Sequence, residues 1–181
     1  MEKSGRFQVI KDGLITGIIG YATVAILYVF FDLLAARGFL YTVNLLGQAL
    51  FMGLRDPAVL LSPMELDITA IFLYNTLHLI IALIIGMIVI GLVDFTERQP
   101  SKAQRILFFL FLGFVITVAS VGYLTSSIRP LLPWWSIVIA NILSIILAGF
   151  YLLKKHPGIG PHLILLMAKL LIFPHRRKPS S

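Results

Sequence analysis

Four long apolar segments constrain this chain more than any short motif does. They cover residues 14–36, 68–93, 106–128 and 134–153, and each has roughly the 20 residues that are needed to cross the hydrocarbon core of a bilayer. Lipid offers no hydrogen-bond partner to a backbone, so each segment must be helical. The sequence therefore predicts an all-α integral membrane protein in which four transmembrane helices form a bundle.

Composition excludes the soluble alternatives. Hydrophobic residues make up 59% of the 181 residues and charged residues 13%, against about 25% charged in soluble domains. A soluble domain of this size leaves roughly a third of its surface exposed and could not bury so much apolar surface. A disordered chain and a nucleic-acid-binding domain are therefore excluded. The chain has no Cys, which excludes disulfides, iron–sulfur clusters and cysteine nucleophiles.

The distribution of Lys and Arg predicts the orientation in the membrane. Segments on alternate sides of the four spans carry 12 and 3 of these residues, and the formal net charge is +7. The positive-inside rule assigns the richer side, with both termini, to the cytoplasm of a bacterial-type inner membrane. Residues 1–13 are then a cytoplasmic N-terminal segment, 14–153 the transmembrane domain and 154–181 a basic cytoplasmic tail. The first span is too long for a cleaved signal peptide, so we expect it to be retained.

The connections between the spans have patterns of their own. In the outer connection, 37–67, Thr42 can cap an amphipathic helix whose apolar residues extend to Leu54 and which Pro57 ends. This helix is expected on the outer surface or over the mouth of the bundle, either as a cover or as a lid or docking element. The connection 94–105 is short and of mixed charge, which is typical of a solvated hinge.

The C-terminal tail predicts contact with the membrane surface. Residues 163–173 are mostly apolar but too few to span the core, so a short interfacial or re-entrant helix is expected. Lys169 interrupts this segment, and further basic residues lie on either side of it. The basic side chains suited to anionic lipid headgroups are Lys154, Lys155, Lys169, Arg176, Arg177 and Lys178.

Polar and small residues form one stripe on each span. Such stripes mark helix–helix contacts in membranes, and we expect them to face the inside of a compact bundle. They are Gly17, Tyr21, Tyr28 and Asp32; Ile71, Asn75, His78, Ala82 and Gly86; Gly113, Thr117 and Ser120; Ile137, Asn141, Ser144 and Ala148.

Most of the polar residues fall in the outer half of the bundle, and five of them could line one pocket there. The simplest hypothesis is that these polar residues hold the helices together by hydrogen bonds, with Asp32 lying beside Arg37. One alternative is a ligand or proton-linked site in which His78 titrates and Asp32 supplies the opposite charge. Another is b-type haem bound through His78 with a second ligand from a partner chain. The candidate residues are Asp32, Asn75, His78, Tyr123 and Asn141.

Catalytic and metal-binding patterns are missing from the sequence. Neither a nucleophile elbow, a zinc-protease motif nor a phosphate-binding loop occurs, and His and carboxylate residues are not clustered at metal-ligand spacing. We therefore expect no enzyme, but a structural or accessory protein. It would be a small subunit of a larger membrane complex or a homo-oligomer, with lipid as its other partner. The alternative is a small-molecule or proton-linked binding or transport protein.

Overall fold

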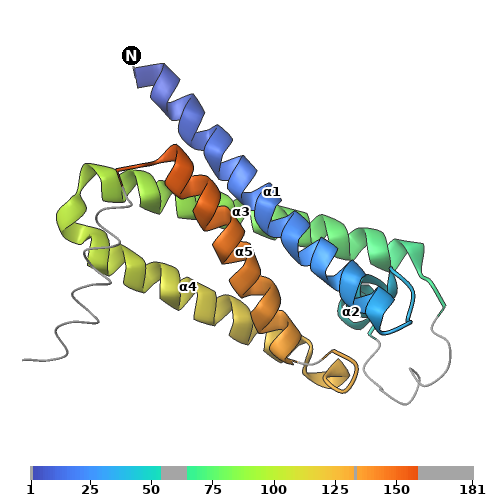
Figure 1. The fold of residues 1–181 in the computed structure, drawn as a ribbon. Helices are drawn as coiled ribbons and strands as arrows, with labels where there is room; N and C mark the ends of the chain where they lie inside the picture. Colours follow the sequence, from blue (N-terminus) through green and yellow to red (C-terminus); the bar gives the residue numbers. More distant parts are fainter. Residues whose placement is uncertain (1, 54–64, 133, 159–181) are drawn as a thin grey trace, which may run out of the picture.

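The computed structural model describes residues 2–53, 65–132 and 134–158, and the regular elements of this part are all helices (Figure 1). The long helices α1, α3, α4 and α5 are each long and apolar enough to cross a membrane, as the four predicted spans require. The elements are α1 (Glu2–Leu34), α2 (Tyr41–Phe51), α3 (Ile68–Arg98), the short 3₁₀ helix η2 (Pro100–Lys102), α4 (Ala103–Leu124), the 3₁₀ helix η3 (Ser126–Ile128) and α5 (Trp134–Lys155).

Two helices extend beyond the ends of the predicted spans. The predicted N-terminal segment 1–13 is helical, because α1 begins at Glu2 and continues without a break into the first span. The predicted hinge 94–105 is mostly helical, since α3 runs to Arg98 and η2 begins at Pro100. Extending an existing helix costs far less than nucleating one. The restriction that a proline imposes on the residue before it then ends α3.

Helix α1 is the centre of the packing: it contacts both α3 and α5, and it crosses α3 in Figure 1. Its contact with α3 is close because glycines face each other there. A Cβ on Gly86 of α3 would collide with backbone atoms of Gly13 and Gly17, and one on Gly17 would collide with the backbone of Ala82. Small residues let membrane helices approach in this way. The predicted stripes of the first two spans thus meet.

Helix α2 packs over the start of α3. A Cβ on Gly47 would collide with the backbone of Ala70. Leu45 and Leu46 of α2 are buried in a hydrophobic cluster with Ile128 and Leu132, from the region between α4 and α5, and with Ile137 of α5. The amphipathic helix predicted in the outer connection is therefore present and covers this end of the bundle. It ends at Phe51, earlier than expected, and Pro57 lies outside the described residues.

The other end of the bundle is where α1 begins and α5 ends, and we call it the terminal end. Ile90 and Val93 of α3 form a second buried cluster there with Leu152 of α5. Lys154 and Lys155 are exposed in the last turn of α5. The expected interfacial helix at 163–173 and the basic residues Lys169, Arg176, Arg177 and Lys178 lie outside the described residues.

Helix α4 departs from the expected compact bundle. It contacts α5 and α3, but most of its side chains are exposed, and in Figure 1 it lies to one side of the crossing of α1 and α3. Gly113 and Ser120, predicted to face inward, are exposed, whereas Ile106 is buried. The prediction that this stripe faces inward is therefore wrong for Gly113 and Ser120, whereas Thr117 is half-buried. Ile106 and Val121 contribute to the packing of α4, since Ile106 is buried and Val121 packs against the hydrophobic cluster that contains Leu45 and Leu46.

Candidate functional site

Asp32 lies in the last turn of α1, where it is only 1% exposed. Its Oδ2 accepts the backbone N–H of Thr42 at 2.7 Å, and its Oδ1 accepts the Thr42 hydroxyl at 2.6 Å. The predicted cap by Thr42 is therefore wrong, since Leu40 is the N-cap residue and its side chain caps nothing. Asp32, which belongs to α1, caps α2 instead, because its carboxylate lies at the positive N-terminal end of α2 and accepts a backbone N–H there.

Arg37 does not pair with Asp32 as expected. Its guanidinium donates a hydrogen bond to the carbonyl oxygen of Leu131 at 3.1 Å and lies over the ring of Tyr41, 5.2 Å from the ring centre. The two donors of Thr42 supply the hydrogen bonds that a buried carboxylate needs. The charged residues at this end thus join α1 to α2 and to the segment before α5.

Asn75 and His78 lie together in the contact between α1 and α3. The Tyr21 hydroxyl donates to Asn75 Oδ1 at 3.1 Å, and Asn75 Nδ2 donates to the carbonyl oxygen of Ile71 at 2.9 Å. The His78 ring lies beside the rings of Tyr21 and Tyr74, with centre-to-centre distances of 5.1 and 5.8 Å. Polar side chains that hold packed membrane helices together are arranged in this way.

Among the described residues, no hydrogen bond or ring contact joins the other predicted residues to this pair. Asn141 Nδ2 donates to the carbonyl oxygen of Ile137 in its own helix at 2.8 Å, and Tyr123 is 80% exposed. Asp32 is three helical turns beyond Tyr21 on α1, about 16 Å at the usual rise per residue. The structure therefore brings together Asn75 and His78 but not all five residues, and a single pocket needs convergent polar groups.

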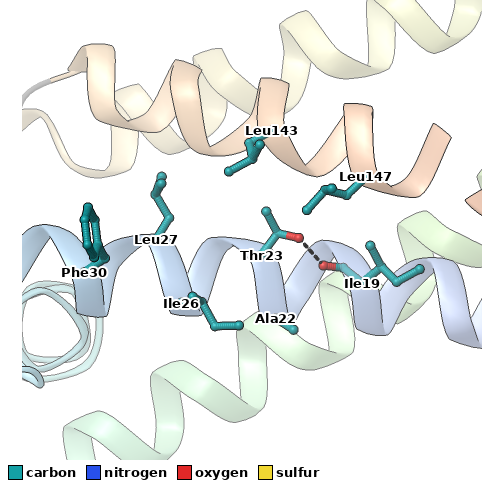
Figure 2. Close-up of a pocket in the computed structure, with 8 residues that line it drawn as sticks. All are labelled: Ile19, Ala22, Thr23, Ile26, Leu27, Phe30, Leu143 and Leu147. Atoms are coloured by element: carbon teal, nitrogen blue, oxygen red, sulfur yellow. Dashed lines mark hydrogen bonds between the residues drawn. The ribbon is translucent and has the colours of Figure 1, made fainter. Parts of the chain in front are cut away.

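A groove between α1 and α5 lies apart from all five residues (Figure 2). Its volume is about 410 Å³. The hydroxyl of Thr23 donates to the carbonyl oxygen of Ile19 at 2.6 Å, so the polar side chain of the groove is already occupied. The groove is otherwise apolar and is lined by Ile19, Ala22, Thr23, Ile26, Leu27, Phe30, Leu143 and Leu147.

A second polar cluster lies at the terminal end, where the sequence analysis placed charged segments but no candidate site. Asp12 of α1 is 1% exposed. Its Oδ1 accepts the Tyr151 hydroxyl at 2.6 Å, and both of its carboxylate oxygens accept the Gln8 amide, at 3.1 and 3.0 Å. His156, just after α5, places Nε2 3.6 Å from Asp12 Oδ2 and Nδ1 3.1 Å from Glu97 Oε2. We call Gln8, Asp12, Glu97, Tyr151 and His156 the terminal cluster.

The sequence did contain a signal for the terminal cluster. Gln8, Asp12 and Thr16 recur at every fourth residue, which places them on one face of a helix. The signal was missed because residues 1–13 were read as a segment outside the first helix. Because α1 is continuous, Asp12 lies on the same helix as the first apolar span, and its carboxylate accepts a hydrogen bond from Tyr151 of α5.

Comparisons with known proteins give no match to a family model, to a curated protein or to a solved structure. In the described residues, no group of three or more His, Asp or Glu side chains could hold a metal ion. Haem binding through His78 stays a prediction, since its second ligand would come from another chain. The described polar groups mainly form hydrogen bonds between helices. At the terminal end, the ring of His156 also lies between the carboxylates of Asp12 and Glu97.

Proposed function

We propose that this chain is a structural or accessory membrane protein that self-associates through α4. One contrast supports the proposal. Asp32, Asn75 and Asn141, on the other three long helices, have their hydrogen bonds inside the fold. On α4 the hydroxyl of Thr117 likewise bonds within the helix, but Gly113, Ser120 and Tyr123 are exposed. A hydroxyl that faces hydrocarbon without a partner is unfavourable, so a second helix is the natural cover.

The outward face of α4 has a regular pattern. We call Phe109, Gly113, Ile116, Ser120 and Tyr123 the α4 stripe. These residues are separated alternately by four and three positions, and all five are exposed. A repeat of this kind averages 3.5 residues, which is the period of helices that pack along each other with a left-handed twist. A Cβ on Gly113 would meet no atom within 4 Å, so the face is open along its length.

A second copy of the chain fits the α4 stripe well. Copies inserted in one membrane share an orientation, so two α4 helices meet in parallel around a two-fold axis. Each residue of the stripe then faces its own counterpart. A hydroxyl both donates and accepts hydrogen bonds, so Ser120 is complementary to itself, and Gly113 lets the two backbones approach.

The absence of Cys from the sequence makes a direct test possible. Single variants Ile116→Cys and Ser120→Cys are made in the full chain and oxidised in native membranes. The proposal expects disulfide-linked dimers from both. The control is Val118→Cys, at a similar depth on the other side of α4, where the side chain is half-buried and should not cross-link. Equal cross-linking of all three variants, or none, would contradict self-association through this stripe.

A larger membrane complex is the other form of the accessory role. It would be favoured if the stripe variants cross-link to a different protein and never to themselves. The binding or transport alternative, with a pocket built from Asp32, Asn75, His78, Tyr123 and Asn141, has less support because these side chains lie in separate places.

The orientation belongs to the same proposal. We place both termini in the cytoplasm of a bacterial-type inner membrane. The support is the 12-to-3 division of Lys and Arg between the two sides. Lys154 and Lys155 are exposed at the end of α5, where they are suited to contact anionic headgroups.

A further inference from the structure

Two exposed cations stand together where α3 turns into α4 (Figure 1). The Nζ of Lys102, in η2, lies over the ring of Phe95 on α3, 5.2 Å from the ring centre. Arg105 of α4 follows Lys102 by three positions, which places the two side chains on one side of the chain. We call Phe95, Lys102 and Arg105 the α3–α4 corner.

The two cations of the α3–α4 corner have no counter-charge nearby in the fold. Neither forms an ion pair with a described residue. The carboxylates just before them in the sequence have other partners, since Asp94 pairs with Arg98 at 3.0 Å and Glu97 lies 3.1 Å from His156. No acidic residue follows Glu97 in the sequence, so α4, α5 and the basic tail offer no anion either. The natural counter-charge is therefore an anion from outside the chain.

An exposed apolar face of α3 leads from the α3–α4 corner into the span. Ile84, Ile88, Gly91 and Phe95 are separated by four, three and four positions, so they lie on one face of the helix. All four are exposed. A Cβ on Gly91 would meet no atom within 4 Å. Between Ile88 and Phe95 this face therefore has a notch into which no side chain projects.

We propose that the α3–α4 corner is a binding site for an anionic phospholipid. The phosphate group of the lipid accepts hydrogen bonds from Lys102 and Arg105, and one acyl chain lies along Phe95 and the notch at Gly91. Basic side chains at the ends of membrane helices recognise anionic headgroups, and charged donors form strong hydrogen bonds with phosphate oxygens. The apolar notch selects a lipid over a free phosphate ion, because only a lipid has a chain to place there.

The contact with Phe95 distinguishes this site from a general attraction of the basic surface to lipid. The cation–π interaction keeps the ammonium group of Lys102 beside the apolar face that would receive the acyl chain. Headgroup and chain are then bound by neighbouring parts of one helix end. Lys154 and Lys155 belong to the end of α5 and are not part of this site.

The test follows the acyl chain next to the notch. Ile88→Cys gives the full chain a single cysteine for a fluorophore, and the protein is inserted in mixed vesicles of phosphatidylcholine and phosphatidylglycerol. In one preparation the phosphatidylglycerol has brominated chains, which quench fluorescence on contact, and in the other an equal amount of the phosphatidylcholine does. Both preparations have the same surface charge. Brominated phosphatidylglycerol should quench more strongly, because the anionic lipid is enriched at the site.

Variants of the labelled chain separate the site from surface charge in general. Lys102→Gln should lower the preference for phosphatidylglycerol about fivefold, which is the contribution of one cation near an anionic headgroup. Lys102→Arg keeps the charge and should keep the preference. The control Lys11→Gln removes one exposed cation from α1 and should leave the preference unchanged. Equal quenching by the two brominated lipids, or an equal loss in Lys102→Gln and Lys11→Gln, would overturn the site.

Inorganic phosphate, added at constant ionic strength, tests whether the site takes a free anion. The preference for phosphatidylglycerol should persist, and its loss would overturn a lipid site. The site goes beyond the proposed self-association and does not depend on it, since Ile88 lies on α3 and outside the α4 stripe. Both leaflets of the vesicles contain the same lipids, so the result is also independent of orientation.

Discussion

Asp32 of α1 holds the first turn of α2 through Thr42, accepting its backbone N–H at 2.7 Å and its hydroxyl at 2.6 Å. This contact spans a sharp change of chain direction between the two helices. Ala36 and Gly38 have positive φ values of 54° and 84° in the turn that allows it. A buried carboxylate therefore fixes where α2 begins and how it folds back over the bundle.

Removing this carboxylate should destabilise the protein. Asp32→Ala leaves the N–H and hydroxyl of Thr42 buried without an acceptor, which costs about 1–3 kcal/mol. Thermal unfolding of the purified protein in detergent measures the loss. Asp94→Ala is the matched control, since its pair with Arg98 is exposed and such pairs contribute about 0–1 kcal/mol. Equal effects of the two substitutions would contradict the role of Asp32.

The close contact of α1 and α3 depends on Gly86. In Gly86→Ala the added methyl group would collide with the backbone of Gly13 and Gly17, so the helices must separate, at a cost of about 1–3 kcal/mol. Gly91→Ala on the same helix meets no neighbouring atom. It should be neutral or slightly stabilising, because Ala favours helix over Gly by about 1 kcal/mol. A loss of stability in Gly91→Ala as large as in Gly86→Ala would count against this packing.

Asn44 joins α2 to the start of α3 and is fully buried. Its Oδ1 accepts the N–H of Asp67 at 3.0 Å, and its Nδ2 donates to the carbonyl oxygen of Glu65 at 2.9 Å. Asn44→Leu should therefore cost about 1–3 kcal/mol of unfolding free energy, because both groups lose a partner. Gln48→Leu should cost less, since Glu65 keeps its bond from Asn44. The melting temperature of Asn44→Leu should therefore be lower than that of Gln48→Leu, and the reverse order would contradict the role of Asn44.

The orientation can be tested with two single-Cys variants, because the chain has no Cys. Phe39→Cys lies in the exposed turn before α2, and Lys102→Cys lies in the exposed η2 at the opposite end. A maleimide that cannot cross membranes should label Phe39→Cys in intact cells and Lys102→Cys only after lysis. The reverse pattern would show that the termini are outside.

Several parts of the fold were predictable from local pattern. The four long helices follow from apolar length, because a backbone in lipid must satisfy its hydrogen bonds within its own helix. The helix α2 follows from apolar residues spaced three and four apart between Thr42 and the glycine at position 53. The facing of Gly17 and Gly86 follows from stripes of small residues, since these are what membrane helices use in close contacts.

The candidate site was less predictable, because helix period places residues on a face but does not say which helix that face meets. Asp32 and His78 belong to stripes that both face inward, yet Asp32 contacts α2 and His78 contacts α1. Tyr123, placed in the same pocket by its depth, is exposed on α4. Depth and face together therefore do not establish that side chains converge.

The number of long helices and the division of charge follow from residue type alone, because an apolar segment of sufficient length in lipid must satisfy its backbone hydrogen bonds within its own helix. The partners of the buried polar groups were decided by tertiary structure. Asp12 and His156 are 144 positions apart in the chain, yet their side chains lie 3.6 Å apart. They meet because α1 packs against α3 through its glycines and also packs against α5, which brings the ends of three helices to one place.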